Sequence, residues 1–248
     1  MSKKETTRVT FTFYLKGDMD NWWAACQKTG FGIDWKMRIP PNLRRRIAGV
    51  KYETAVKFLK PYLKNLYKSR KKHIRKLMTA CSTYWADNEK EIFKRLKKIT
   101  KHPIWPERIY CFYTSFPRGP YGTARNHAWL YITEYSLKDR KRCASAILHE
   151  IIHFQFHKYF WAYCEKHGLN DQQTQHLKEA VTFLINEEFS DLVLHDKGYP
   201  IHKKLRAELR IVWGKDKNFR KVLDRGIFLI KNKYTDLSPG GRDRVLIA

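Results

Sequence analysis

The sequence predicts an α+β fold with an N-terminal strand, a basic helical region, a small sheet and a C-terminal helical half. Three short runs rich in β-branched and aromatic residues are typical of strands, at residues 7–15, 109–114 and 127–133. In much of the remaining chain, apolar residues recur every three or four positions, which indicates helices with one buried face. The 248 residues, 43% of them hydrophobic, are enough to bury a sizeable core.

The first half of the chain is expected to be mainly helical after its N-terminal strand. Residues 18–50 are ambiguous. A helix is predicted over about residues 51–76, because one face of it would gather Val56, Leu59, Leu63, Leu66 and Tyr67. Pro61 lies inside that helix and should kink or split it. A second basic helix is predicted over about residues 86–99.

The middle of the chain is expected to form the sheet and the first helices after it. The turn-rich residues 117–122 should connect the strand at 109–114 to a returning strand at 127–133. Helices are then predicted over about residues 142–164 and 173–194.

The end of the chain should continue as helices to about residue 231, with Trp213 and Phe228 as buried anchors. We expect a single domain over residues 1–248. Its parts would be a strand with the basic helical region, then sheet and helices, then a loose tail, at residues 1–105, 106–235 and 236–248.

The charge of the chain is strongly unbalanced, at +26. Residues 36–101 alone hold 21 Lys or Arg and four Asp or Glu, a net +17, and aromatic side chains interleave with the basic clusters. Such a surface fits the phosphate backbone of nucleic acid, which we expect as a possible partner of residues 36–101. An anionic membrane and an acidic protein are the other usual partners of so basic a chain.

The cysteines and the hydropathy pattern favour a cytoplasmic protein. Five cysteines are dispersed without a C-x-x-C pair, which is typical of reduced thiols; they are Cys26, Cys81, Cys111, Cys143 and Cys164. The first residues lack the apolar run of a secretory signal. Since no apolar run approaches 18 residues, we expect no membrane span and no membrane partner.

One segment carries the pattern His-Glu-x-x-His, at His149, Glu150 and His153. On a helix, His149 and His153 share a face about 6 Å apart along the axis, so both imidazoles can reach one Zn²⁺. Glu150 follows the first histidine, where it can act as the general base on water bound to the metal. The flanking residues are apolar, so the pattern predicts a zinc site in a water-poor helix.

This pattern resembles the zincin metallopeptidases over roughly residues 109–195. The resemblance implies a small mixed sheet before the motif helix, with an edge strand that binds extended substrate; here that strand would be residues 126–133. It also implies hydrolysis of a peptide bond in a peptide or protein substrate.

The resemblance also implies a third metal ligand. Residues 186–191 match the N-E-x-x-S-D pattern of thermolysin-like gluzincins. Glu187 would then be the ligand, and Asp191 would accept a hydrogen bond from the far nitrogen of His149. Glu187 lies farther past His153 than the ligand of that family does, which leaves room for an alternative.

Glu179 is that alternative, because it lies closer in sequence to the two histidines. Its own helix face holds Thr182 and Asn186, which could support it. His157 is not a candidate, because on a continuous helix it lies about 12 Å along the axis from His149. We expect His157 to be a surface or packing residue.

A peptidase also needs a donor for the oxyanion of the tetrahedral intermediate. His195, Tyr199 and His202 follow the ligand helix, and Tyr199 and His202 are the catalytic candidates. The sequence thus predicts a zinc-dependent metallopeptidase with its catalytic part in residues 106–235. The alternative is a basic nucleic-acid-binding protein whose metal site is structural or inactive.

Overall fold

The computed structural model describes residues 7–27, 29–30 and 33–234, and it confirms the α+β class. The predicted tail at 236–248 lies outside the described residues. The chain divides into two compact units, which we describe one at a time. The sheet unit comprises Arg8–Tyr84 and Arg108–Cys143, and the helical unit comprises residue 7, Trp85–Glu107 and residues 144–234. The single domain over residues 1–248 stays a prediction.

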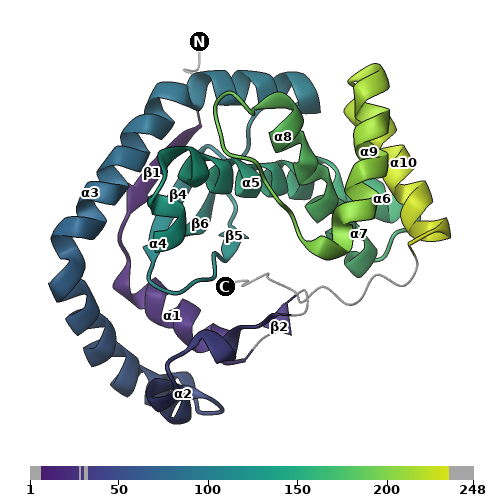
Figure 1. The fold of residues 1–248 in the computed structure, drawn as a ribbon. Coiled ribbons are helices and arrows are strands. Elements are labelled where there is room, and N and C mark those ends of the chain that lie inside the picture. Colours follow the sequence, from purple (N-terminus) through teal and green to yellow (C-terminus); the bar gives the residue numbers. More distant parts are fainter. Residues whose placement is uncertain (1–6, 28, 31–32, 235–248) are drawn as a thin grey trace. The chain divides into compact units, whose positions relative to one another are not determined.

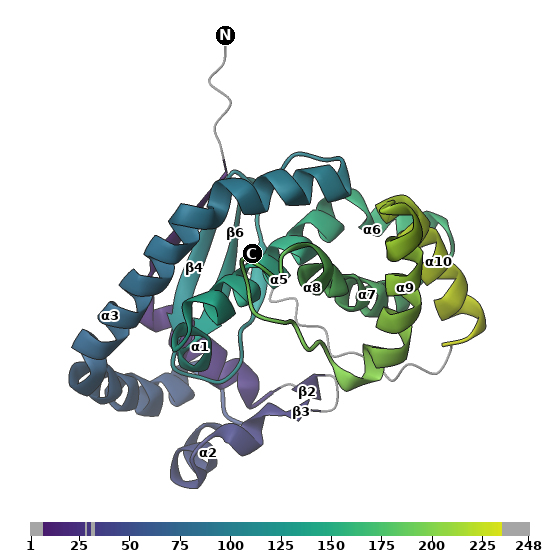
Figure 2. The ribbon, with the colours of Figure 1, turned by 45° about the horizontal axis from the view of Figure 1, so that its top comes forward.

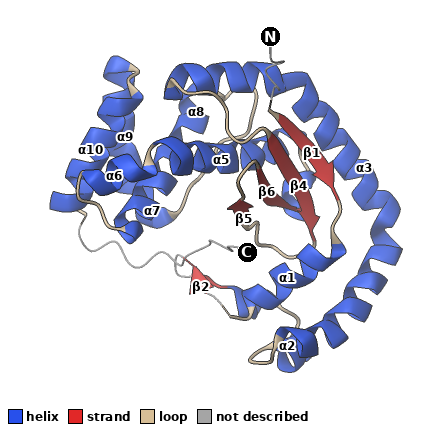
Figure 3. Ribbon diagram, turned by 180° about the vertical axis from the view of Figure 1, so that it is seen from behind, coloured by secondary structure: helices blue, strands red, loops and turns tan. Residues whose placement is uncertain are grey.

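The sheet unit contains, among its described residues, a mixed four-stranded sheet of order β1-β4-β6-β5 (Figures 1 and 3). β1 (Arg8–Thr12) is parallel to β4 (Arg108–Thr114), and β4 is parallel to β6 (His127–Thr133). The short β5 (Tyr121–Thr123) is antiparallel to β6. Alternate residues of β4 and β6 are buried, as a sheet with one covered face requires; they include Ile109, Cys111, Tyr113, Ala128, Leu130 and Ile132.

The connection between β4 and β6 differs from the predicted turn. β6 is parallel to β4, with Arg108 opposite His127, so the prediction of a returning strand is wrong. A parallel partner requires the chain to travel back to the starting end of the first strand. Residues 115–126 form this connection, and β5 lies within it. β6 therefore lies between β4 and β5, and the prediction that residues 126–133 form the edge strand is also wrong.

The ambiguous N-terminal residues form short elements in the sheet unit. They are α1 (Leu15–Ala25), β2 (Thr29–Gly30), β3 (Ile33–Asp34), the 3₁₀ turn η1 (Trp35–Arg38) and α2 (Pro41–Ile47). Pro41 occupies the first turn of α2, where a backbone N–H has no partner within the helix. Their buried side chains form one core with the start of the next helix, including Met19, Trp22, Ile39, Leu43, Ile47, Leu59 and Leu63. A short helix α4 (Glu134–Leu137) follows β6.

Helix α3 (Tyr52–Thr100) is continuous over 49 residues, so the prediction of two separate helices is wrong. Pro61 lies within it and removes one backbone donor near its start, without dividing it. The segment between the two predicted helices contains no glycine or proline, and it keeps the spacing of a buried face. The buried residues along this stretch are Ile74, Cys81, Trp85 and Ile92.

A buried carboxylate connects α1, α3 and the end of β4 within the sheet unit. Asp18 is fully buried and accepts hydrogen bonds from the hydroxyls of Tyr67 (2.5 Å), Ser115 (2.6 Å) and Thr114. The backbone N–H of Ser115 donates a fourth bond, at 3.2 Å. Burial raises the pKa of Asp18, and these four bonds only partly oppose the shift.

The helical unit contains the end of α3, residues 85–100, and a series of further helices and 3₁₀ turns (Figure 2). They are α5 (Arg140–Tyr159, in this unit from residue 144), α6 (Trp161–Lys166), α7 (Asp171–Ala180), η2 (Val181–Phe183), α8 (Leu184–Glu188), η3 (Pro200–His202), α9 (Lys203–Asp216) and α10 (Phe219–Asn232). The helix predicted over 142–164 is divided at Phe160, whose φ of −124° is not helical. The helix predicted over 173–194 contains a 3₁₀ turn and ends at Glu188.

The start of α7 is fixed by a capping box. The Asn170 side chain accepts a hydrogen bond from the backbone N–H of Gln173 (2.9 Å), and the Gln173 side chain accepts one from the N–H of Asn170 (3.0 Å). Because the cap sets the first residue of α7, it also sets the direction in which each later side chain of the helix points.

α9 and α10 lie side by side at the C-terminal end of the described residues (Figures 1 and 2). Trp213 is buried, as predicted, whereas Phe228 is 55% exposed, so its prediction as an anchor is wrong. Asn218 caps α10 by accepting from the backbone N–H groups of Arg220 and Lys221. Within the described residues, no helix has both the length and the apolar character needed to span a membrane.

Candidate metal centre

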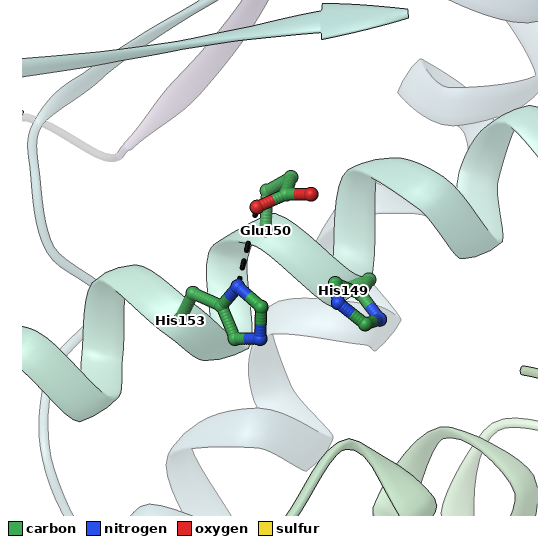
Figure 4. Close-up of side chains that lie close together, drawn as sticks. All are labelled: His149, Glu150 and His153. Carbon is green, nitrogen blue, oxygen red and sulfur yellow. Dashed lines mark ion pairs between the residues drawn. The ribbon is translucent and has the colours of Figure 1, made fainter. Parts of the chain in front are cut away.

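The His-Glu-x-x-His pattern lies on α5, which is buried over most of its length. His149 and His153 occupy adjacent turns of this helix, with Glu150 beside them (Figure 4). Their side chains are 18%, 2% and 16% exposed, in the order His149, His153, Glu150. Ligand atoms of the three residues lie within 4.8 Å of one another, so the cluster could hold a metal ion.

Glu179, on α7, faces both imidazoles. Its Oε2 lies 3.5 Å from Nε2 of His149 and 3.5 Å from Nε2 of His153. Two ligand atoms that each lie 2.0–2.1 Å from a tetrahedral Zn²⁺ are about 3.4 Å apart. The distance from Oε2 of Glu179 to each Nε2 is therefore close to the separation of two ligands of one metal ion.

The second oxygen of Glu179 has a different partner. The ammonium group of Lys178 lies 2.9 Å from Oε1, and the Lys178 side chain is only 2% exposed. A buried lysine is rare unless it is paired, so this contact accounts for its burial. The ion pair fixes the carboxylate with Oε1 towards Lys178 and Oε2 towards the histidines.

Asp196 contacts the other nitrogen of His149, with Oδ1 at 3.5 Å from Nδ1. A carboxylate at this position orients a ligand imidazole and selects its tautomer. Asp196 is itself held by Arg206, at 3.0 Å, and by the hydroxyl of Thr182, at 2.8 Å. The side-chain amide of Asn186 exchanges two hydrogen bonds with the backbone of Asp196, at 2.7 and 2.9 Å.

The loop after Asp196 is shaped to admit the Arg206 side chain. Gly198 has φ of +60°, a conformation that side chains disfavour. A Cβ at this position would lie 2.5 Å from Nη1 of Arg206, which is too close for two unbonded atoms. Glycine therefore lets the guanidinium approach the loop and pair with Asp196.

Glu150 lies on a different side of His153 from Glu179. Its Oε2 is 3.3 Å from Nδ1 of His153, the contact drawn as a dashed line in Figure 4. Each imidazole thus has a carboxylate near both of its nitrogens: Asp196 and Glu179 for His149, and Glu150 and Glu179 for His153.

The pKa values reflect this dense packing of charges. Burial alone would raise the pKa of Glu179, but His153, Lys178 and His149 outweigh it and hold the pKa well below its ordinary value. Burial would lower the pKa of His149, but Asp196 and Glu179 raise it well above. The pKa of His153 is well below its ordinary value, mainly through burial. The carboxylates around His149 thus favour a proton on that ring, whereas burial favours the neutral form of His153.

The structure places the two carboxylates implied by the zincin resemblance elsewhere. Glu187, on α8, pairs with Arg210 at 2.7 Å, and its side chain is 28% exposed. Asp191 pairs with Arg95 through both oxygens, at 2.7 and 2.9 Å, so the contact to His149 comes from Asp196 in its place.

The candidate oxyanion donors differ in their surroundings. His195 is exposed and Tyr199 is partly buried. His202 is fully buried, and its Nε2 lies 2.8 Å from Nδ1 of His176. Burial lowers the pKa of His202 to about 4, which keeps this imidazole neutral. His157 stacks on Trp161, with ring centroids 4.8 Å apart, which confirms the prediction of a packing role.

Three residues of the site, Lys178, Asp196 and Arg206, carry no signal in the sequence that predicts them there. Thr182 and Asn186 were predicted to support Glu179, and their side chains instead contact Asp196. A comparison with protein-family models finds no match for this chain, and comparisons with curated proteins and with solved structures find none either.

Proposed function

We propose that this protein is a zinc-dependent metallopeptidase in which His149, His153 and Glu179 hold the ion. The observation that carries the proposal is the position of one carboxylate oxygen, Oε2 of Glu179, at 3.5 Å from Nε2 of both histidines. Two imidazoles and one carboxylate are a ligand set of catalytic zinc sites, which keep a further position for water or substrate.

The surrounding residues have distinct tasks in this proposal. Asp196 accepts the Nδ1 proton of His149 and thereby leaves Nε2 of that ring as the ligand atom. Lys178 neutralises Oε1 of Glu179 and directs Oε2 to the ion. When bound, Zn²⁺ supplies polarisation of the peptide carbonyl and lowers the pKa of water from 15.7 towards ~7.

Glu150 is the proposed general base. Its side chain is more exposed than that of Glu179, at 16% against 6%. It contacts Nδ1 of His153, whereas Glu179 faces the Nε2 atoms of both histidines, so Glu150 is available for a role other than that of third ligand. Its carboxylate takes a proton from water and later delivers it to the leaving amine. Tyr199, which is partly buried in the loop before η3, is the proposed donor to the oxyanion.

Metal analysis of paired variants tests the ligand set. Wild-type protein should contain one zinc per chain, and Glu179→Gln should lose most of it because an amide is a far weaker ligand than a carboxylate. Glu187→Gln, the same change eight residues on, should keep its zinc. Retention of zinc by Glu179→Gln together with its loss from Glu187→Gln would overturn the assignment.

Peptide hydrolysis tests the reaction itself. A mixed library of quenched fluorescent peptides should be cleaved by wild-type protein, with activity removed by a chelator and restored by zinc. Zinc at one equivalent with no cleavage of any peptide in the library would leave the site structural, and the peptidase proposal would fail.

A further inference from the structure

Six basic residues form a stripe along α3 within the sheet unit. They follow one another at intervals of three or four residues, which places them on one side of the helix. We call Lys57, Lys60, Lys64, Lys68, Lys71 and Arg75 the basic stripe, and each of them is exposed. Arg75 lies 18 residues after Lys57, so the stripe extends about 27 Å along the helix axis.

The stripe is not balanced by acidic residues on the same part of the helix. Residues 54–84 contain no Asp or Glu. The opposite side of this segment is buried, through Ala55, Leu59 and Leu63, so the cations cannot turn inwards. Self-repulsion along such a stripe is costly in the free protein and is relieved by a polyanion.

The C-terminal end of the stripe forms one wall of a hollow with aromatic residues. β1 lies beside α3 (Figures 1 and 3), and the two elements line a cavity of about 470 Å³. Phe11 and Phe13 line it from the strand side, and Tyr67 lines it from the helix together with Lys68, Lys71 and Arg75.

The aromatic part of this hollow is both accessible and held in place. The side chain of Phe13 is 44% exposed, so its ring is accessible from solvent. Its ring meets that of Tyr67 edge-on, with centroids 4.5 Å apart, and the Tyr67 hydroxyl donates to the buried Asp18. A stacked ligand would therefore meet rings whose positions are already fixed.

We propose that this hollow and the basic stripe bind single-stranded nucleic acid. One base stacks on Phe13 in the hollow, and the adjoining phosphates pair with Lys68, Lys71 and Arg75. The strand then continues along the stripe towards Lys57. This combination of a basic track and aromatic platforms is the general way in which proteins bind single strands without reading sequence.

The shape and charge of the surface favour a single strand over other polyanions. In a duplex the bases are stacked on one another, so only the phosphate contacts would remain. An acidic peptide carries no flat rings to stack in the hollow. A lipid bilayer is contacted by protruding apolar residues, whereas these aromatic side chains line a concavity.

Binding of a fluorescein-labelled 20-mer of deoxythymidine, followed by anisotropy at several salt concentrations, tests the proposal. The variant Lys68→Gln/Lys71→Gln/Arg75→Gln should bind at least tenfold more weakly at 0.1 M salt. Each phosphate contact contributes about 0.7 to the slope of log K against log salt for a single strand, so the slope should fall by about 2. The control Lys203→Gln/Lys204→Gln/Lys215→Gln makes the same charge change at exposed sites of α9 and should keep the slope.

A second variant tests the stacking. Phe13→Leu keeps an apolar side chain but removes the ring, and it should weaken binding about tenfold without changing the salt slope. Thermal unfolding and circular dichroism establish that each variant is folded. The same 20-mer as a duplex with deoxyadenosine should bind more weakly and should not respond to Phe13→Leu.

Three results would overturn the proposal. Equal weakening by the α9 control triple would assign binding to net charge alone. Equal affinity for polyglutamate of the same charge would point to an acidic protein, and binding to vesicles containing phosphatidylserine without binding to the 20-mer would point to a membrane. None of these readouts depends on zinc or on peptidase activity.

Discussion

Asp18 in the sheet unit and Glu179 in the helical unit are both buried carboxylates, yet their pKa values move in opposite directions. Asp18 is surrounded by neutral donors, three hydroxyls and one backbone N–H, and burial raises its pKa. Glu179 faces two imidazoles and the ammonium of Lys178, and these outweigh burial and lower its pKa.

The difference shows what a buried acid needs in order to act as a metal ligand. Hydrogen-bond dipoles can hold a carboxylate in place, but here they do not offset the free-energy cost of burying its charge. A neighbouring cation can, and an ionised carboxylate is the form that binds a metal. Asp18 thus has the surroundings of a structural residue, whereas those of Glu179 suit the ligand role that we propose for it.

Glu150 is neither a structural carboxylate like Asp18 nor a proposed ligand like Glu179, but the proposed general base. Its substitution should have the largest effect of the changes considered, and that effect should be on turnover. Glu150→Gln removes the proposed base but leaves the oxygen of Glu179 that faces both histidines. Turnover of peptide should fall by about 10²–10⁴-fold, the usual contribution of a general base, while zinc content stays at one per chain. Loss of zinc from this variant would make Glu150 a ligand, and unchanged turnover would remove it from the mechanism.

Lys178→Met should make the surroundings of Glu179 more like those of Asp18, because it removes the cation next to the buried carboxylate. Without the ammonium group, burial should raise the pKa of Glu179 above its wild-type value. Removing one partner of a buried ion pair typically costs about 3–5 kcal/mol, which urea unfolding of zinc-free protein at pH 7 would measure. Lys197→Met, at an exposed lysine, is the control and should cost little.

The pH dependence of that variant gives a second readout. In the wild type, ionised Glu179 contributes stability that is complete above its unfolded pKa of about 4.5 and is lost as the pH falls through the much lower folded pKa. In Lys178→Met the loss should begin at higher pH. A pH profile parallel to that of the wild type would show that Lys178 does not control the charge of Glu179.

Asp196→Asn should have a smaller effect, on metal affinity. The amide is a weaker acceptor for the Nδ1 proton of His149, and loss of such a contact typically lowers zinc affinity about 10–100-fold. Competition with a chelating indicator measures it. Asp191→Asn is the matched control, because Asp191 pairs with Arg95. A larger loss from the Asp191 variant would restore the arrangement implied by the zincin resemblance.

Asp18→Asn should give the smallest effect, a change of about 1–2 kcal/mol at most in the free energy of unfolding. The informative quantity is the direction in which this change depends on pH. A raised folded pKa means that wild-type Asp18 contributes less stability as the pH rises above its unfolded value of 3.8. The stability of wild type relative to Asp18→Asn should therefore decrease between pH 4 and neutrality. Asp20→Asn, two residues on and paired with Lys16, should show no such trend.

The local features of the site could be predicted because they depend on one helix. The spacing of His149 and His153 requires only that residues 149–153 be helical, which the apolar periodicity indicated. The strands at β1, β4 and β6 followed in the same way from β-branched and aromatic residues. Their pairing did not, since nothing local to residues 115–126 reveals that the chain returns to make β6 parallel to β4.

The choice between Glu179 and Glu187 depended on geometry that the sequence does not carry. A continuous helix over 173–194 would have kept both acids in one regular projection. The 3₁₀ turn η2 lies between them and has about 3.0 residues per turn in place of 3.6, so it shifts the angular position of the residues after it, and Glu187 pairs with Arg210. Asp196 was missed because it reaches His149 from a loop, across 47 residues of sequence, with no periodicity to indicate it.

The capping box at Asn170 has a consequence for how this site tolerates change. Successive residues of an α-helix are turned by about 100° from one another, so inserting or deleting one residue between the cap and Glu179 would swing that carboxylate a quarter-turn or more around the axis of α7. Substitutions on the exposed side of α7 leave the angular position of Glu179 unchanged. A change in the number of residues between Asn170 and Glu179 does not. Two uncharged side chains, Asn170 and Gln173, thus determine the angular position of a charged one about two turns further along the helix.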